Sequence, residues 1–166
     1  KTCSERGWPL EIYETSESYE DLVIKYGFPG PNLHQMFMSY LKGRCIRQFK
    51  IVHPTAALAS GVRLAESQRR GMQAKPISEW EGVIVYAPIL DWSTKDTWAY
   101  FKRHGFDRAP AYTTLQISGD CLCGAYARED EPAAMRTHYQ ALWKRIEALQ
   151  IKAKEVHELY WEWGWG

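Results

Sequence analysis

Residues 60–70 read Ser-Gly-Val-Arg-Leu-Ala-Glu-Ser-Gln-Arg-Arg, and they follow a small apolar run at 55–59, Thr-Ala-Ala-Leu-Ala. The run predicts a short buried strand, and the glycine after it predicts a turn into a helix. Spacings of three and four place four polar side chains on one face of that helix: Arg63, Glu66, Ser67 and Arg70. Strand-to-helix junctions of this kind bind anions in open α/β sheets, because the helix N-terminus offers free N–H groups. Two arginines add donors suited to phosphate or sulfate. The alternative is an ordinary junction with a solvated charged face.

Strand and helix patterns alternate along the rest of the chain. Two further strands are predicted at 10–13 and 83–87, and the segment 71–81 reads as a polar loop. Beside the helix that follows residue 60, helices are predicted at 19–26, 32–42, 45–52, 94–104, 132–149 and 152–161. The alternation predicts an α/β fold with a mostly parallel sheet flanked by helices, incomplete at its N-terminal edge and helical at its C-terminal end.

Composition narrows the class of protein. Because 21 basic residues nearly balance 20 acidic ones, the net charge of +1 creates no general attraction to nucleic acid or membranes. No apolar run reaches membrane-spanning length and the first residues lack a secretion-signal pattern, so we expect a cytoplasmic protein without a membrane partner. The 166 residues suit one domain. Four cysteines, at positions 3, 45, 121 and 123, are too few for a disulfide framework and predict reduced thiols or a metal site.

Taken together, the motifs of residues 1–127 resemble those of the phosphoadenosine phosphosulfate (PAPS) reductase family, whereas 128–166 form a helical extension without a match. The resemblance rests on the order and spacing of several elements: Ser-Gly-Val-Arg-x-x-Glu-Ser-x-x-Arg at 60–70, Pro-Ile-Leu-Asp-Trp at 88–92, Asp96-x-Trp98-x-Tyr100, Gly-Asp-Cys-Leu-Cys-Gly at 119–124, and Cys45 with Lys50 and Pro54 after it. It implies an adenine nucleotide alpha-hydrolase-like, Rossmann-like fold that binds an adenylated nucleotide at the carboxyl ends of the strands.

The resemblance also implies a function and a set of binding residues. The nucleotide would be PAPS, adenylyl sulfate or ATP, and the activity would be sulfonucleotide reduction in sulfur metabolism, an oxidoreductase or transferase reaction with a thioredoxin-like electron donor. The residues expected to bind the nucleotide or its sulfate are Ser60, Gly61, Arg63, Glu66, Ser67, Arg70, Lys50 and Asp91. The sequence leaves open whether the chain forms a homodimer.

Two features of the family are not found in the sequence. The first is a glycine-rich phosphate loop of the type Ser-Gly-Gly-Lys-Asp-Ser, whose N–H groups would cradle the phosphates. The second is the nucleophilic cysteine of a Glu-Cys-Gly-x-His tail, because residues 160–166 read Tyr-Trp-Glu-Trp-Gly-Trp-Gly. The sequence therefore leaves open an enzyme that is part of a longer product and a non-catalytic nucleotide-binding remnant.

The cysteines allow three interpretations. Some family members hold a [4Fe–4S] cluster with cysteines from these regions, so Cys45, Cys121 and Cys123 could hold a cluster or a zinc ion. That interpretation favours a sulfur-transfer enzyme that modifies DNA or tRNA, although nucleic acid is not the favoured partner. Cys121 or Cys123 is otherwise a catalytic nucleophile. The third interpretation makes them small buried side chains.

Overall fold

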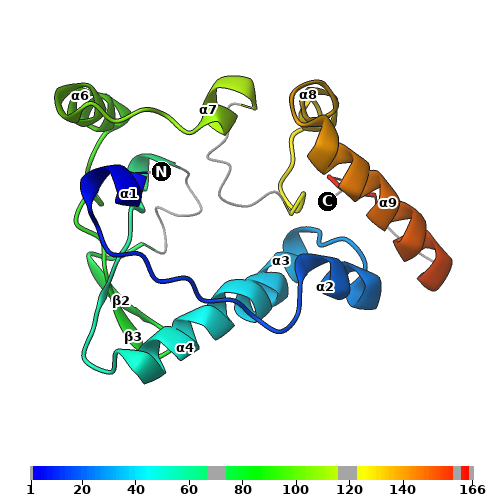
Figure 1. The fold of residues 1–166 in the computed structure, drawn as a ribbon, viewed down its shortest axis with the longest axis horizontal. Coiled ribbons are helices and arrows are strands. Elements are labelled where there is room, and N and C mark those ends of the chain that lie inside the picture. Colours follow the sequence, from blue (N-terminus) through cyan, green and yellow to red (C-terminus); the bar gives the residue numbers. More distant parts are fainter. Residues whose placement is uncertain (1, 67–73, 116–122, 159–161, 165–166) are drawn as a thin grey trace.

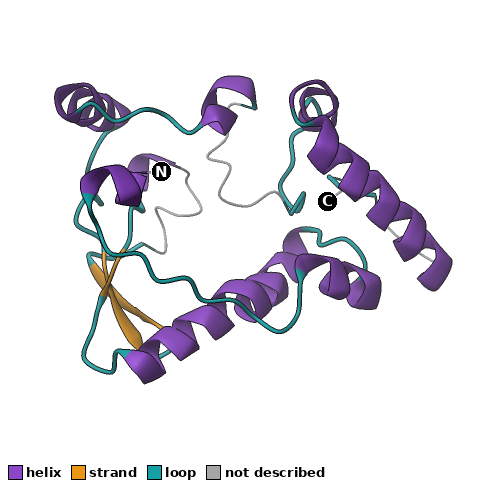
Figure 2. Ribbon diagram, viewed as in Figure 1, coloured by secondary structure: helices purple, strands orange, loops and turns teal. Residues whose placement is uncertain are grey.

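A computed structural model describes residues 2–66, 74–115, 123–158 and 162–164. Helices dominate these residues, and a small sheet lies at one side of the molecule (Figures 1 and 2). The predicted α/β class, a sheet flanked by helices with a helical C-terminal end, is confirmed. The sheet was predicted to be mostly parallel, whereas its described strands form one parallel and one antiparallel pair. The elements in chain order are α1 (Thr2–Arg6), α2 (Tyr19–Tyr26), α3 (Pro31–Met38), the π-helical turn η1 (Ser39–Gly43), α4 (Arg44–Val52), β1 (Leu58–Ala59), the 3₁₀ turn η2 (Leu64–Glu66), β2 (Ile77–Trp80), β3 (Val83–Tyr86), α6 (Thr94–His104), α7 (Pro110–Thr114), α8 (Glu131–His138) and α9 (Gln140–Val156).

The sheet has three described strands in the order β1-β3-β2. β1 runs parallel to β3 with Leu58 opposite Val85, whereas β2 runs antiparallel to β3 with Ile77 opposite Tyr86. β1 and β3 are far apart in sequence, and their parallel pairing brings their carboxyl ends to one edge of the sheet. The loops that follow these two strands therefore start side by side.

β2 corrects the prediction of a polar loop at 71–81. Its residues 77–80 read Ile-Ser-Glu-Trp, and the next two residues, Glu81 and Gly82, have φ angles of +51° and +75°. Positive φ at both central positions is what a two-residue hairpin turn needs to match the twist of its strands. The glycine of this turn, directly before the apolar run 83–86, was thus the available hairpin signal.

β3 confirms the strand predicted at 83–87, although only one of its faces is buried. Val83 is fully buried, whereas Ile84 and Tyr86 are 57% and 50% exposed, and the neighbouring Ile77 on β2 is 64% exposed. The register places Ile77 opposite Tyr86, so these three side chains share the open face of the sheet. α4 packs against β3. β1 is shorter than the predicted strand 55–59 and is not fully buried, because it pairs with β3 at two positions only.

A continuous helical rod of α3, η1 and α4 crosses the molecule from α2 to the sheet (Figure 1). The sequence predicts two helices here, and both are present, but a π-helical turn joins them instead of a break: the Arg44 N–H donates to the Ser39 carbonyl, five residues back. Gly43 is buried in this turn, and a Cβ there would lie 2.7 Å from Glu81 Oε1. The missing side chain leaves room for Glu81 to pass over the rod and form an ion pair with Arg47.

The segment predicted as a strand at 10–13 is not a strand. It runs along the α3–η1–α4 rod (Figure 1), with Leu10 and Ile12 exposed. Tyr13 alone turns inward, and its ring meets Phe49 of α4 edge-on with centroids 6.1 Å apart. The segment therefore packs on a helix surface through Tyr13 and not on a neighbouring strand, and the apolar side chains of the alternation stay exposed.

The apolar core lies among the helices and not under the sheet. α2 is fixed at its start by a capping box between Ser18 and Asp21, and it packs against α9. α9 buries Trp143, Ile146 and Leu149 at spacings of three, whereas Val156 at its end is exposed. The core residues are Leu22, Val23, Phe28, Phe37, Leu115, Met135, Trp143, Ile146, Leu149, Ala153 and Trp163.

The boundary between the last two helices differs from the predicted one at 149–152. α8 ends at His138, and α9 continues unbroken through the predicted gap. Tyr139 adopts φ −132° and ψ 50°, which is not helical, and its hydroxyl lies 2.8 Å from Thr114 Oγ1. This contact with α7 fixes the break. Among the described helices, none is both long and apolar enough to cross a membrane.

Candidate functional site

The loop after β1 is joined to β3 and to the loop after β3 by backbone hydrogen bonds. The Ser60 N–H donates to the Tyr86 carbonyl at 2.8 Å, and the Leu64 N–H donates to the Leu90 carbonyl at 2.9 Å. The Ser60 hydroxyl in turn accepts from the Val62 N–H at 3.4 Å. The predicted binding segment therefore has a defined conformation at the carboxyl edge of the parallel pair.

Arg63 is the most unusual residue of this loop, because it is only 9% exposed although it carries a charge. Its Nε lies 3.6 Å from Glu66 Oε1. Its Nη1 is buried and has no hydrogen-bond partner among the described residues. A buried donor without a partner destabilises the fold by about 1–3 kcal/mol, and by more when it is charged. An oxyanion is the ligand that would satisfy such a guanidinium.

The predicted helix face is only partly described. Residues 64–66 form the 3₁₀ turn η2, in which the Glu66 N–H donates to the Arg63 carbonyl at 3.2 Å. Ser67 and Arg70 lie outside the described residues. The structure thus brings Ser60, Gly61, Arg63 and Glu66 into one loop, and leaves the place of the second arginine open.

Asp91 and Gly61 complete the described edge. Asp91 is exposed at the end of the loop after β3, next to the residue whose carbonyl binds the Leu64 N–H. Gly61 is exposed as well, and a Cβ there would meet nothing within 4 Å. Its backbone is therefore open to a ligand, and no crowding within the described structure demands a glycine.

Lys50 has a local contact. It lies in the last turn of α4, and its Nζ donates to the Pro54 carbonyl at 2.6 Å. That contact stabilises the end of the helix and the turn into β1. A role of Lys50 in nucleotide binding stays a prediction.

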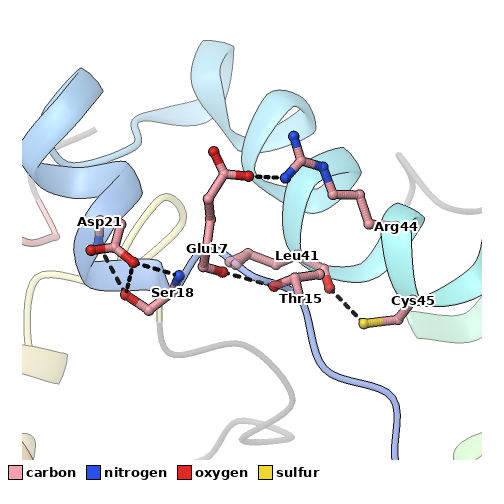
Figure 3. A network of polar contacts seen from close by, with 7 residues as sticks. All are labelled: Thr15, Glu17, Ser18, Asp21, Leu41, Arg44 and Cys45. Carbon is pink, nitrogen blue, oxygen red and sulfur yellow. Dashed lines mark hydrogen bonds and ion pairs between the residues drawn. The ribbon is translucent and has the colours of Figure 1, made fainter. Parts of the chain in front are cut away.

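Cys45 fastens the segment before α2 to the helical rod. Its Sγ donates to the carbonyls of Tyr13 and Leu41, each at 3.3 Å, and Figure 3 shows the Leu41 contact beside the ion pair between Arg44 and Glu17. Arg47, one turn further along the same helix, is paired with Glu81. Because carboxylates partner both arginines, the basic face of α4 is better explained as a solvated helix face than as a nucleic-acid surface.

Beside Cys45, an exposed carboxylate joins two other titratable groups. Glu11 Oε2 accepts from the Tyr13 hydroxyl at 2.6 Å and lies 2.8 Å from His53 Nε2. The hydrogen bond from Tyr13 lowers the pKa of Glu11 most, and the bond from His53 lowers it further. The bond between Tyr13 and Glu11 also raises the pKa of Tyr13. The cluster ties residues 11–13 to the end of α4.

Cys123 lies apart from the loop after β1, in surroundings formed by three segments that are distant in the sequence. Its Sγ is 3.6 Å from His34 Nδ1 on α3, and its carbonyl accepts from the Tyr19 hydroxyl of α2 at 2.8 Å. The next residue, Gly124, has φ +81°, and a Cβ there would lie 2.8 Å from both Trp163 Nε1 and the Gly164 nitrogen. Only glycine fits this position. Sequence reasoning missed His34, since 89 residues separate it from Cys123 and no local pattern connects them.

The predicted metal set is not assembled by the described residues, among which no group of three or more His, Cys, Asp or Glu is placed to hold a metal ion. Cys45 contacts two backbone carbonyls, whereas Cys123 contacts a histidine. Cys121 lies outside the described residues. A cluster or zinc ion on Cys45, Cys121 and Cys123 therefore stays a prediction.

Fold and loop geometry together define an α/β protein whose candidate anion site lies at the carboxyl edge of two parallel strands. The model of the phosphoadenosine phosphosulfate reductase domain matches residues 1–117, so the chain belongs to that family. The chain is also 32% identical over 156 residues to an uncharacterized 37.8 kDa protein from the gpa 5′ region of Escherichia phage 186. That match covers 84% of this chain and 46% of the phage protein, so the chain spans about half the length of its relative.

Proposed function

We propose that the chain binds the sulfate or phosphate end of an adenylated nucleotide in the loop after β1, as part of sulfonucleotide chemistry. The observation that carries this proposal is the buried Nη1 of Arg63, which has no hydrogen-bond partner among the described residues. A sulfate or phosphate oxygen placed against it would remove the penalty of the buried donor and gain a charge-assisted hydrogen bond. Membership of the PAPS reductase family makes a sulfonucleotide the favoured ligand.

Each residue of the loop has a distinct part in this proposal. Arg63 donates to the anion, and Glu66 holds the Nε side of its guanidinium. Gly61 leaves the backbone open for a close approach of the nucleotide. Asp91, exposed on the adjoining loop, offers a carboxylate to the ribose hydroxyls or to another donor of the nucleoside.

Calorimetric titration of the chain under anaerobic conditions tests the proposal. The ligands are PAPS, adenosine 3′,5′-bisphosphate and ATP, each titrated into the chain, Arg63→Ala and Arg63→Lys. Loss of the charge-assisted contact weakens PAPS binding about tenfold or more in Arg63→Ala. Arg63→Lys keeps the charge but loses the planar donors, so its affinity falls in between. Tighter binding of PAPS than of the bisphosphate identifies the sulfate as the recognised group.

The matched control is Arg103→Ala, which removes an exposed arginine from the last turn of α6. It should bind PAPS as the unchanged chain does. Equal affinities in Arg63→Ala and Arg103→Ala, or no binding by the unchanged chain, would overturn the proposal.

A further inference from the structure

We propose that Cys123 and His34 form a reactive thiol site, separate from the nucleotide loop, that accepts a small molecule carrying a sulfur–sulfur bond on an apolar body. The proposal covers disulfides and persulfides, which share that bond. It rests on the contact between the thiol and the imidazole, on the cavity that both residues line, and on the charges around that cavity.

The contact places a base directly beside the thiol. Sγ and Nδ1 are 3.6 Å apart, within the range of a hydrogen bond to sulfur, so a thiol proton can pass to the imidazole nitrogen. A thiolate is the nucleophilic form of cysteine, and a neighbouring imidazolium stabilises it. Cys45 offers a contrast within the same chain, because its thiol faces two backbone carbonyls, which cannot take up a proton.

Contacts of neighbouring side chains hold both the Cys123 backbone and the His34 ring in place. The Tyr19 hydroxyl fixes the Cys123 carbonyl at 2.8 Å, and Gly124 packs against Trp163 so closely that a Cβ would not fit. The His34 ring meets Tyr126 edge-on with centroids 5.0 Å apart. These contacts hold the thiol and the imidazole together without help from the nucleotide loop.

The cavity has a volume of about 330 Å³, enough for a small organic molecule. Its walls are mostly aliphatic and aromatic side chains of α3, η1 and α9. Its charged lining residues are Glu20, Lys42 and Arg145, and an ion pair joins Arg145 to Glu20 at 2.5 Å. Charged groups thus border apolar walls, and a ligand with an apolar body and a charged group matches this lining.

The reaction is a thiol–disulfide exchange. The proton of Cys123 moves to His34 Nδ1, and the Cys123 thiolate attacks one sulfur of the ligand. A new bond forms between Cys123 Sγ and that sulfur, while the sulfur–sulfur bond of the ligand breaks. The second half of the ligand leaves as a thiolate and takes the proton back from the imidazole. Cys123 is oxidised and the leaving half is reduced, so no further oxidant is needed.

The test measures the release of coloured thiolate from 5,5′-dithiobis(2-nitrobenzoate), an aromatic disulfide with carboxylates. One chain keeps Cys123 alone through Cys3→Ser, Cys45→Ser and Cys121→Ser. Its matched control keeps Cys45 alone through Cys3→Ser, Cys121→Ser and Cys123→Ser. At pH 7 the Cys123 chain should react at least about tenfold faster than the Cys45 chain. Equal rates, or a faster Cys45 chain, would overturn the proposal whatever the behaviour of any histidine variant.

Two histidine variants of the Cys123 chain then test the base. His34→Gln keeps a polar side chain but removes the proton acceptor, and His138→Gln makes the same change at an exposed position on α8. His34→Gln should slow the release about tenfold at pH 7, and its rate should keep rising toward the range of a free thiol, about pH 8.5. His138→Gln should leave both rate and pH profile unchanged. Identical profiles in the two variants would contradict the role of His34.

Leu142→Trp, which fills the cavity from α9, separates cavity binding from simple thiol reactivity. It should slow the aromatic disulfide at least about tenfold and leave the much smaller methyl methanethiosulfonate unaffected. An equal effect on both reagents, or none on either, would contradict binding in the cavity. Arg63→Ala should leave all these rates unchanged. The proposal for the thiol site and the proposal for nucleotide binding can therefore be overturned independently.

Discussion

The Leu64 N–H donates to the Leu90 carbonyl at 2.9 Å, and this bond joins the loop after β1 to the loop after β3. The two residues come from strands that pair in parallel through Leu58 and Val85. The bond fixes the position of Leu64, the first residue of η2, which directly follows Arg63. It also brings Asp91, the neighbour of Leu90, to the same edge of the sheet. A backbone contact thus assembles the proposed nucleotide loop from two distant segments.

The buried guanidinium of Arg63 predicts a conflict between stability and binding. Arg63→Met keeps an unbranched side chain but removes the buried donor that has no hydrogen-bond partner among the described residues. The free energy of unfolding of the empty chain should stay constant or rise by about 1 kcal/mol, because an unsatisfied buried donor is lost. PAPS binding should weaken about tenfold or more in the same variant, as it should in Arg63→Ala. Urea unfolding and calorimetry measure the two quantities, and a fall in stability of several kcal/mol would show that Arg63 is mainly structural.

Gly124 predicts a strong sensitivity next to Cys123. Gly124→Ala forces a side chain into the left-handed region and into Trp163, so it should lower the free energy of unfolding by about 2–4 kcal/mol. Gly105→Ala is the matched control, because Gly105 has φ +64° and open space around a Cβ. It should lower stability by only about 1–2 kcal/mol. Similar losses in the two variants would mean that the crowding at Trp163 is unimportant.

The hairpin turn predicts an order of stability between two substitutions at Glu81. Glu81 has φ +51°, which asparagine and glycine adopt more easily than glutamate or alanine. Glu81→Asn and Glu81→Ala both lose the exposed ion pair with Arg47, which is worth at most about 1 kcal/mol. Glu81→Asn should therefore be more stable than Glu81→Ala by about 1 kcal/mol. Thermal unfolding of the two variants measures this, and the reverse order would contradict the turn geometry.

The capping box of α2 predicts a loss of stability in acid. Backbone and side-chain hydrogen bonds from Ser18 lower the pKa of Asp21 in the folded chain. A carboxyl group with a lowered folded pKa stabilises the fold above its unfolded pKa, about 3.9, and this contribution is lost as the pH falls through the folded pKa. Asp21→Asn should therefore lower stability at pH 7 more than at pH 2.5.

Urea unfolding at the two pH values measures the difference, and Asp107→Asn, an exposed aspartate outside the helices, serves as the control. A pH-independent effect of Asp21→Asn would contradict the cap. Ser18→Ala tests the same cap from the other side and should cost about 1 kcal/mol at pH 7.

Local chemistry explains which elements the sequence predicts well. α2 and α6 begin at Ser18 and Ser93, each followed three residues later by an aspartate that closes a capping box. Both helices end directly before a glycine. Such signals span a few residues, so the sequence alone locates these helices.

Tertiary contacts explain what the sequence could not locate. The break at Tyr139 is fixed by Thr114, and the π-helical turn at Gly43 is covered by Glu81, which lies on the β2–β3 turn. The proximity of Arg63 and Glu66 could be read from the sequence, because the two residues are three positions apart on one turn. The contact between His34 and Cys123 was not, because only the packing of α2, α3 and the C-terminal residues brings the two side chains together.

The apolar core lies among the helices, and the buried residues Val83, Ala87 and Leu90 are not part of it. We therefore expect local unfolding at two levels, in which strands of two to four residues open at a lower free energy than the helices that share the core. Amide hydrogens of β1 and β3 would exchange faster than those of α2 and α9. A nucleotide bound by Arg63 would slow amide exchange in the sheet and not in α2 or α9. Ligand binding would then stabilise the sheet end of the molecule, which the apolar core does not reach.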